Sequence, residues 1–206
     1  MTIEIKISKK PVEYKKAIRL LEQRVTNVAN KKSNELLWIL EHPSIYTGGK
    51  TYKKNEILNK KIQIISTNRG GKITWHGPGQ IICYFVIDLN KRNKDIRNFI
   101  NNLENILINT LRDYKIESFA DRKNIGIWVE KNKKIKKIGA IGLRVKKWIV
   151  YHGFSLNITN NLDPYLKILP CGIKKRGITN LIEIKKQNYK DLKKKIIQNF
   201  ILNMEI

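Results

Sequence analysis

A glycine-rich block directly before the most β-like segment constrains this fold more than any other feature of the sequence. Residues 69–80 read RGGKITWHGPGQ, with four glycines and one proline. Because glycine lets other groups approach the backbone closely, we expect a ligand-binding loop here. The following residues, 81–89 (IICYFVIDL), are branched and aromatic and predict a buried strand. The glycine spacing matches neither the phosphate loop nor the dinucleotide fingerprint, so it predicts neither ATP nor NAD.

The remaining elements alternate between groups of strands and single helices. An opening strand is expected in MTIEIKISKK, and apolar residues recurring every three or four positions predict helices over 11–30, 95–113 and 188–202. Short apolar runs predict further strands at 36–40, 62–67, 126–130, 137–145 and 148–158. A hairpin turn is expected in KNKKIK, between the strands that start at 126 and 137. Since the helices do not follow each strand in turn, we expect an α+β fold with a mixed β-sheet and packed helices. The length of 206 residues predicts a single domain, 1–206.

The net charge of +25 raises the question of a nucleic-acid partner. The cations are 33 lysines against 9 arginines, and arginine is the side chain that most often reads guanine. Lysine, isoleucine and asparagine are all abundant and all have AT-rich codons, which explains the basicity without a nucleic acid. A basic surface would equally steer an acidic protein partner. We therefore expect no nucleic acid, and keep a nucleic-acid-binding module as an alternative.

Two further properties bear on location. No run of eighteen apolar residues is present, so no membrane span is expected, and the first residues lack the apolar stretch of a secretion signal. The two cysteines do not make a disulfide framework, and no Cys-x-x-Cys pair predicts zinc. We expect a cytoplasmic protein without a metal or a cofactor.

Cysteine and lysine supply the reactive groups. Cys171 lies between Pro170 and Gly172, on an expected turn, and is a better nucleophile candidate than Cys83, which lies in the apolar strand. Lys137 opens the apolar, small-residue stretch KIGAIGLR, where burial would favour a neutral amine. The base that activates the thiol could be Lys137 or one of the histidines at 76 and 152. Sequence spacing does not choose among them.

Four ordered blocks make the chain similar to a known family. They are ILEHPSIYTGGK at 39–50, RGGKITWHGPGQ at 69–80, KIGAIGLRV at 137–145, and HGFSLNI with PCGI between 152 and 173. In these blocks the chain resembles the octanoyltransferases of lipoate biosynthesis, which move an octanoyl group from acyl carrier protein to lipoyl domains. The family fold is similar to that of biotin and lipoate protein ligases.

The resemblance implies roles for individual residues. Cys171 would be the nucleophile and Lys137 its activating partner. The walls of the acyl pocket would be formed by Arg69, Gly70, Gly71, Lys72, Ile73, Thr74, Trp75, His76, Ala140, Ile141, Gly142, Gly153, Phe154 and Ser155.

The implied reaction passes through a cysteine acyl-thioester. Octanoyl-acyl carrier protein is the expected donor, and a lysine of the lipoyl domains of 2-oxoacid dehydrogenases or of the glycine cleavage H protein is the expected acceptor. The second alternative is an ATP-dependent lipoate or biotin ligase of the same fold, in which the cysteine of PCGI would have no evident purpose. Basic residues next to the proposed site in sequence are expected to steer the acidic carrier protein; they are Lys72, Arg144, Lys146, Lys147, Lys174, Lys175 and Arg176.

Overall fold

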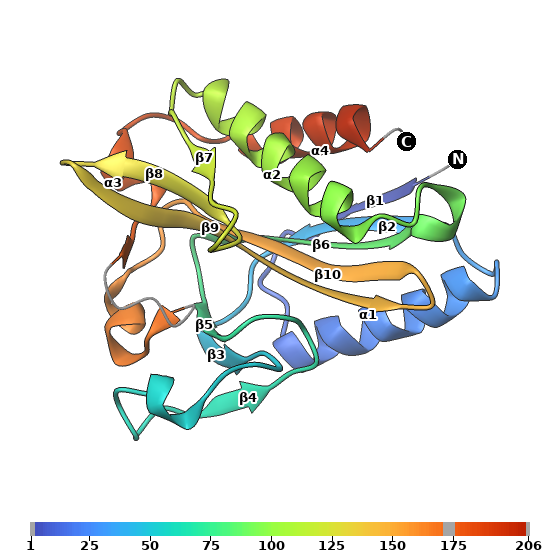
Figure 1. Ribbon diagram of the computed structural model, residues 1–206, viewed down its shortest axis with the longest axis horizontal. Coiled ribbons are helices and arrows are strands. Elements are labelled where there is room, and N and C mark those ends of the chain that lie inside the picture. The colour runs from blue at the N-terminus through green and yellow to red at the C-terminus, as the bar shows by residue number, and fades with distance from the viewer. Residues whose placement is uncertain (1–2, 171–175, 205–206) are drawn as a thin grey trace.

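Two β-sheets of unequal size and the helices around them form the described part of the chain. The computed structural model describes residues 3–170 and 176–204. The main sheet has the strand order β1–β2–β6–β10–β9–β8–β7, with β11 beside β9 (Figure 1). The small sheet has the order β4–β3–β5 and lies on the same side of the main sheet as α1 (Figure 1).

The bounds of the elements are as follows. The main sheet contains β1 (Ile3–Ile7), β2 (Glu35–Leu40), β6 (Gln80–Asp88), β7 (Phe119–Ala120), β8 (Ile127–Lys131), β9 (Lys134–Lys146), β10 (Ile149–Asn157) and β11 (Gly177–Ile178). The small sheet contains β3 (Ile45–Gly48), β4 (Ile64–Ser66) and β5 (Ile73–His76). The helices are α1 (Tyr14–Ala29), α2 (Ile96–Arg112), α3 (Leu181–Ile184) and α4 (Leu192–Asn203), with short 3₁₀ turns η1 (Lys54–Glu56), η2 (Leu89–Lys91) and η3 (Asp163–Lys167).

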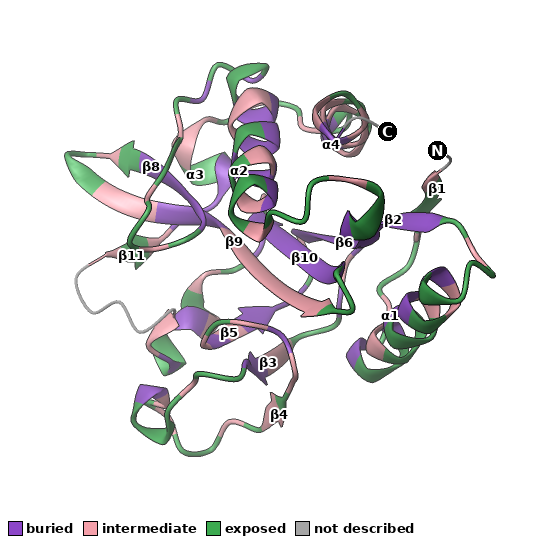
Figure 2. Cartoon of the chain, turned by 45° about the vertical axis from the view of Figure 1, so that its right-hand side comes forward, coloured by how far each residue is buried: buried purple, intermediate pink, exposed green. Residues whose placement is uncertain are grey.

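Strand β6 is buried on both faces, which explains why the sequence 81–89 is continuously apolar. Its odd-numbered residues, such as Cys83 and Phe85, share a core with α2 and α4. Its even-numbered residues, such as Ile82 and Tyr84, share a second core with α1. Figure 2 shows the resulting continuous burial along β6 and β10. A mixed sheet with helices on both faces confirms the predicted α+β class.

Most predicted elements are confirmed, with small shifts at their ends. The helices predicted over 11–30 and 95–113 are α1 and α2, and the C-terminal helix begins at Leu192 rather than at residue 188. The predicted hairpin turn is confined to Asn132 and Lys133, both with positive φ, because a two-residue turn of this kind matches the twist of the flanking strands. None of the helices in the described residues is long and apolar enough to cross a membrane.

Two predictions, one for the glycine-rich block and one for the residues before it, were wrong in extent. The block 69–80 was expected to be a loop, but Ile73–His76 form strand β5 and pair with β3. Isoleucine, threonine and tryptophan favour strands, and a partner strand outside the block outweighs the neighbouring glycines. The strand expected over 62–67 is reduced to β4, Ile64–Ser66.

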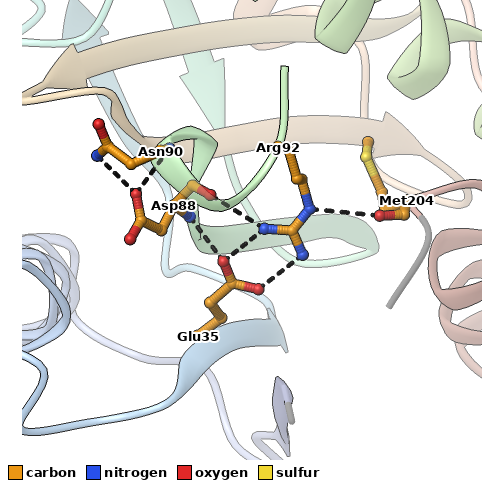
Figure 3. A network of polar contacts seen from close by, with 5 residues as sticks. All are labelled: Glu35, Asp88, Asn90, Arg92 and Met204. Atoms are coloured by element: carbon orange, nitrogen blue, oxygen red, sulfur yellow. Dashed lines mark hydrogen bonds and ion pairs between the residues drawn. The ribbon is translucent and has the colours of Figure 1, made fainter. Parts of the chain in front are cut away.

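A buried ion pair joins the end of β6 to β2. Glu35 accepts hydrogen bonds from Arg92 Nη1 and Nη2 at 2.6 and 2.9 Å, and from the backbone N–H of Asp88 at 2.8 Å (Figure 3). Arg92 also donates to the backbone carbonyls of Asp88 and Met204 (Figure 3). Glu35 is only 2% exposed, so every oxygen of its carboxylate depends on these partners.

We expect Glu35→Ala to lower the free energy of unfolding by about 3 kcal/mol, because it leaves the Arg92 guanidinium, only 14% exposed, without its counter-charge. Urea denaturation followed by circular dichroism measures the loss. The control is Glu4→Ala, which removes the more exposed ion pair with Arg24 at 2.7 Å and should cost under about 1 kcal/mol. Equal losses in the two variants would contradict the assignment.

Candidate active site

A pocket lies between the small sheet and the strands β6, β10 and β9 of the main sheet. Its lining comes from five places: the start of α1, residues 69–76, and the middles of the three strands. In register, Ser155 of β10 pairs with Ala140 of β9, and His152 pairs with Leu143. The pocket therefore runs along the strands, from Ala140 and Ser155 to Gly142 and His152.

The structure brings most of the predicted pocket residues together. Those that line the pocket are Arg69, Gly71, Lys72, Ile73, Thr74, His76, Ala140, Ile141, Gly142, Gly153, Phe154 and Ser155. Gly70 and Trp75 are not among the lining residues. The indole of Trp75 instead packs edge-on against Tyr165 at 5.7 Å and donates to Ser44 Oγ at 2.9 Å. Trp75 thus stabilises the small sheet from its other side.

Gly70 holds the glycine-rich loop against the main sheet. Its N–H donates to the backbone carbonyl of Leu143 at 2.9 Å. A side chain at Gly70 would place its Cβ 2.8 Å from the same carbonyl, and one at Gly142 would lie 3.3 Å from the Gly70 oxygen. Arg69 fixes the other side of the loop by donating to the backbone and hydroxyl oxygens of Thr47, both at 2.9 Å. These contacts hold the glycine-rich loop between β9 and β3.

Gly153 is required by the packing of β10 on β6. A Cβ at this position would lie 1.8 Å from the backbone oxygen of Cys83, far inside van der Waals contact. Cys83 itself is fully buried, and burial raises the pKa of its thiol. Its predicted role as a core residue is confirmed.

His76 is held as a neutral ring by a buried polar network. Gln80 Nε2 donates to Asn157 Oδ1 and to the hydroxyl of Tyr165, both at 2.8 Å. Gln80 Oε1 is therefore the acceptor toward His76, and Nδ1 of the ring carries the proton at 2.7 Å. Burial, with a smaller contribution from nearby His42, lowers the pKa of His76 to about 3.

His152 is fixed in a similar way from the opposite wall. Asn68 Nδ2 donates to Glu22 of α1, which leaves Asn68 Oδ1 to accept the Nε2 proton of His152 at 2.8 Å. Burial, followed by the charges of Arg69 and Arg144, lowers the pKa of His152 to about 3. The backbone of His152 has φ +71°, an uncommon value for a non-glycine residue, which the flanking ladders maintain.

Lys137 enters the core, as predicted, and is 4% exposed. Its Nζ donates to the backbone oxygen of Ile125 at 3.0 Å and lies 4.7 Å from the ring centre of Trp128. The loop that carries Ile125 is held by Glu104 of α2, which accepts the N–H of Gly126 at 3.3 Å. Burial raises the pKa of Glu104, while the charge of Lys137 opposes that shift. An aromatic ring and a backbone carbonyl thus position the Lys137 amino group.

The predicted nucleophile, Cys171, lies outside the described residues, as do Lys174 and Lys175. The chain on both sides of it is anchored. On one side, the Leu169 N–H donates to the Glu56 carbonyl at 2.7 Å. On the other, β11 pairs with β9 so that Ile178 is opposite Lys137, and the Thr179 N–H donates to the Lys137 carbonyl at 3.0 Å.

Sequence reasoning missed three lining residues: Tyr14, Ile82 and Tyr84. Tyr14 is the first residue of α1, and the other two lie on one face of β6. The period-two alternation of β6 was the available signal for Ile82 and Tyr84, but it does not tell which stretch of that face a helix leaves uncovered.

The family follows from comparison with known proteins. Residues 13–201 match the model of the lipoyl protein ligase A/B catalytic domain. The chain belongs to this family. An octanoyltransferase of Ehrlichia ruminantium is 44% identical over 181 residues, which are 87% of this chain and 87% of that protein. An octanoyltransferase of Bartonella bacilliformis is 41% identical over 88% of this chain and 80% of its own length.

The solved structures agree on the fold. A bipartite lipoate protein ligase from Thermoplasma acidophilum superposes with a TM-score of 0.76 at 14% identity, covering 100% of this chain and 85% of its own. Lipoate-protein ligase A bound with ATP gives 0.73 at 15% identity over 98% of this chain and 86% of its own. The ligase-like fold predicted from the sequence is confirmed. The named relatives likewise confirm an acyltransferase acting in octanoyl transfer for protein lipoylation.

The two pocket histidines predict a loss of stability in mild acid. Unfolded histidine binds a proton below a pH of about 6.5, whereas the folded His76 and His152 rings stay neutral until the pH approaches 3. The unfolded state binds more protons between these values, so the free energy of unfolding falls as the pH drops.

We expect a decrease of about 1–2 kcal/mol per histidine from pH 7 to pH 5, measured by urea denaturation at several pH values. His152→Asn should remove one histidine's share of this slope. A stability profile that is flat over the same range would show that these rings are protonated in the folded protein.

Proposed function

We propose that this protein, as a single catalytic domain, transfers an octanoyl group from octanoyl-acyl carrier protein to a lysine of lipoyl domains through a thioester on Cys171. The acceptors would be lipoyl domains of 2-oxoacid dehydrogenases and the glycine cleavage H protein, in the cytoplasm. The observation that supports this most is the β11–β9 ladder, which ties the chain just after the PCGI segment to Lys137 itself.

Lys137 is the partner that the geometry favours among the three candidates for activating the thiol. His76 and His152 have pKa values of about 3, too low for a group that must accept a proton near neutral pH. Their tautomers are also fixed by Gln80 and Asn68. Lys137 is buried and positioned by Ile125 and Trp128, and its strand holds the segment that follows Cys171.

In the first half-reaction, Cys171 loses its proton to Lys137, and its sulfur attacks the carbonyl carbon of the donor thioester. The bond from that carbon to the carrier's sulfur breaks, and the released thiolate takes the proton back from the Lys137 ammonium. One thioester replaces another, so the step is close to isoenergetic.

In the second half-reaction, the amine of the acceptor lysine attacks the same carbon and Cys171 leaves as a thiolate. The proton released by the new amide is taken up through Lys137. An amide is more stable than a thioester, so this half runs downhill. The residues that line the pocket then hold the acyl chain, with apolar contacts from Ile73, Ile141 and Phe154.

Intact mass after mixing the protein with octanoyl-acyl carrier protein, in the absence of ATP, tests the proposal. We expect a gain of one octanoyl group that a lipoyl domain then removes. Cys171→Ala should abolish the adduct, and Cys83→Ala, which removes the buried thiol, should keep it. A folded protein that gains no adduct, or gains one only with ATP and free acid, would overturn the proposal in favour of a ligase.

The role of Lys137 gives a separate prediction. Lys137→Ala should slow acylation of Cys171 by about 10²-fold or more, because a positioned acid–base group contributes on that scale. Rapid-quench mass spectrometry measures the rate, and Lys134→Ala, at an exposed lysine of the same strand, is the control. Equal acylation rates in wild type and Lys137→Ala would show that another group takes the thiol proton.

A further inference from the structure

An exposed apolar and basic surface lies beside the segment that leads to Cys171. It is formed by η1 with the turn after it and by η3, which lie side by side at one edge of the molecule (Figure 1). Backbone hydrogen bonds join them: the N–H groups of Leu58 and Asn59 both donate to the Lys167 carbonyl, at 3.0 and 3.1 Å. We call this the η1–η3 surface and define it by Lys53, Lys54, Leu58, Lys60, Leu166 and Lys167.

Two leucines on this surface are unusually exposed for residues in ordered turns. Leu166 is 75% exposed and Leu58 is 55% exposed, while their neighbour Tyr165 is buried against Trp75. The backbone on which they lie is fixed by the Leu58–Lys167 hydrogen bond and by a bridge between Ile57 and Ile168. Exposed apolar side chains surrounded by charged residues are typical of a protein-binding site.

The rim is almost entirely positive. Residues 50–61 and 162–167 contain six lysines and two acidic residues, Glu56 and Asp163. Glu56 is buried and pairs with Lys72 at 2.8 Å, so it does not offset the exposed lysines. Such a surface suits an acidic partner with an apolar contact of its own.

One contact connects this surface to the pocket, and a second connects it to the segment before Cys171. Lys72, which pairs with Glu56, lines the pocket. The Glu56 carbonyl also accepts the N–H of Leu169, two residues before Cys171. A partner bound at the η1–η3 surface would therefore lie at the edge of the proposed active site.

Three of the basic residues expected from the sequence to steer the carrier do not belong to this surface. Lys146 and Lys147 lie at the β9–β10 turn, which is far from η1 and η3 in Figure 1. Arg176 pairs with Asp121 and stacks on Trp128. These three residues are close to pocket residues in the sequence, but in the fold they do not lie with the lysines of η1 and η3.

We propose that the η1–η3 surface docks the acidic acyl carrier protein that delivers the octanoyl thioester. This inference rests on the proposed function. Lys167 precedes Cys171 by four residues, a length of chain that spans at most about 14 Å. A carrier protein delivers its thioester on a long flexible arm and can bind at such an offset, whereas a lipoyl domain must present a shorter lysine side chain.

The test uses two triple variants with equal changes of charge. Lys53→Glu, Lys54→Glu and Lys167→Glu reverse the rim of the η1–η3 surface. Lys91→Glu, Lys94→Glu and Lys146→Glu reverse exposed lysines near the β9–β10 turn and serve as the control. Lys72 is left unchanged because it lines the pocket. Leu166→Ala removes the most exposed apolar side chain of the surface.

Three rates are measured for each protein: acylation of Cys171 by octanoyl-acyl carrier protein, acylation by the small thioester octanoyl-N-acetylcysteamine, and transfer from the acyl-enzyme to a lipoyl domain. We expect the rim variant to lower kcat/KM for the carrier protein by about tenfold and to weaken its salt dependence. Leu166→Ala should lower it by a few-fold. Acylation by the small thioester and transfer to the lipoyl domain should stay within twofold of wild type, and the control variant should resemble wild type throughout.

Three results would overturn the inference: an equal loss with the small thioester, a loss confined to transfer to the lipoyl domain, or no loss at all. The second would assign the surface to the acceptor instead. If the wild-type protein accepted no acyl group from either thioester, that result would overturn the proposed function itself. It would do so without any comparison of the variants.

Discussion

The pocket depends on one backbone-to-backbone contact, the hydrogen bond from the Gly70 N–H to the Leu143 carbonyl. It brings the glycine-rich loop onto strand β9 so closely that a side chain at Gly70 or Gly142 would meet a backbone oxygen. The small sheet then lies over the middle of β6, β9 and β10, a region of the sheet that α1 leaves uncovered (Figure 2). The contact thus joins the loop that precedes β5 to the main sheet at the edge of the pocket.

The two histidines that line the pocket are held by hydrogen bonds to residues outside the lining. Gln80 and Asn68 each use an amide oxygen to set the tautomer of a histidine, and each amide is itself oriented by a further partner, Asn157 or Glu22. The rings stay neutral because burial disfavours their charged form. In the proposed chemistry the thiol proton therefore moves to Lys137, whose Nζ lies over the Trp128 ring and donates to a backbone carbonyl.

Much of the fold could be predicted because its strands and helices carry strong periodic patterns. The three- and four-residue spacing in 11–30 and 95–113 predicted α1 and α2 to within three residues at each end, and the apolar runs located β2, β6 and β10. Strands β3 and β5 could not be predicted so easily. Each is four residues long and is stabilised by the other, across nearly thirty residues of sequence, so local composition dominated by glycine gave the wrong answer for Ile73–His76.

The sequence by itself determined the family, the fold class, the burial of Lys137 and Cys83, and twelve of the residues that line the pocket, because motifs and apolar periodicity are local properties of the chain. Tertiary structure alone decided that Trp75 faces away from the pocket, that Tyr14 and Tyr84 face it, and that the lysines of η1 rather than those of the β9–β10 turn lie beside the segment leading to Cys171. The physical reason is that side-chain direction and charge placement follow from how distant strands pair and pack, and no local pattern encodes those pairings.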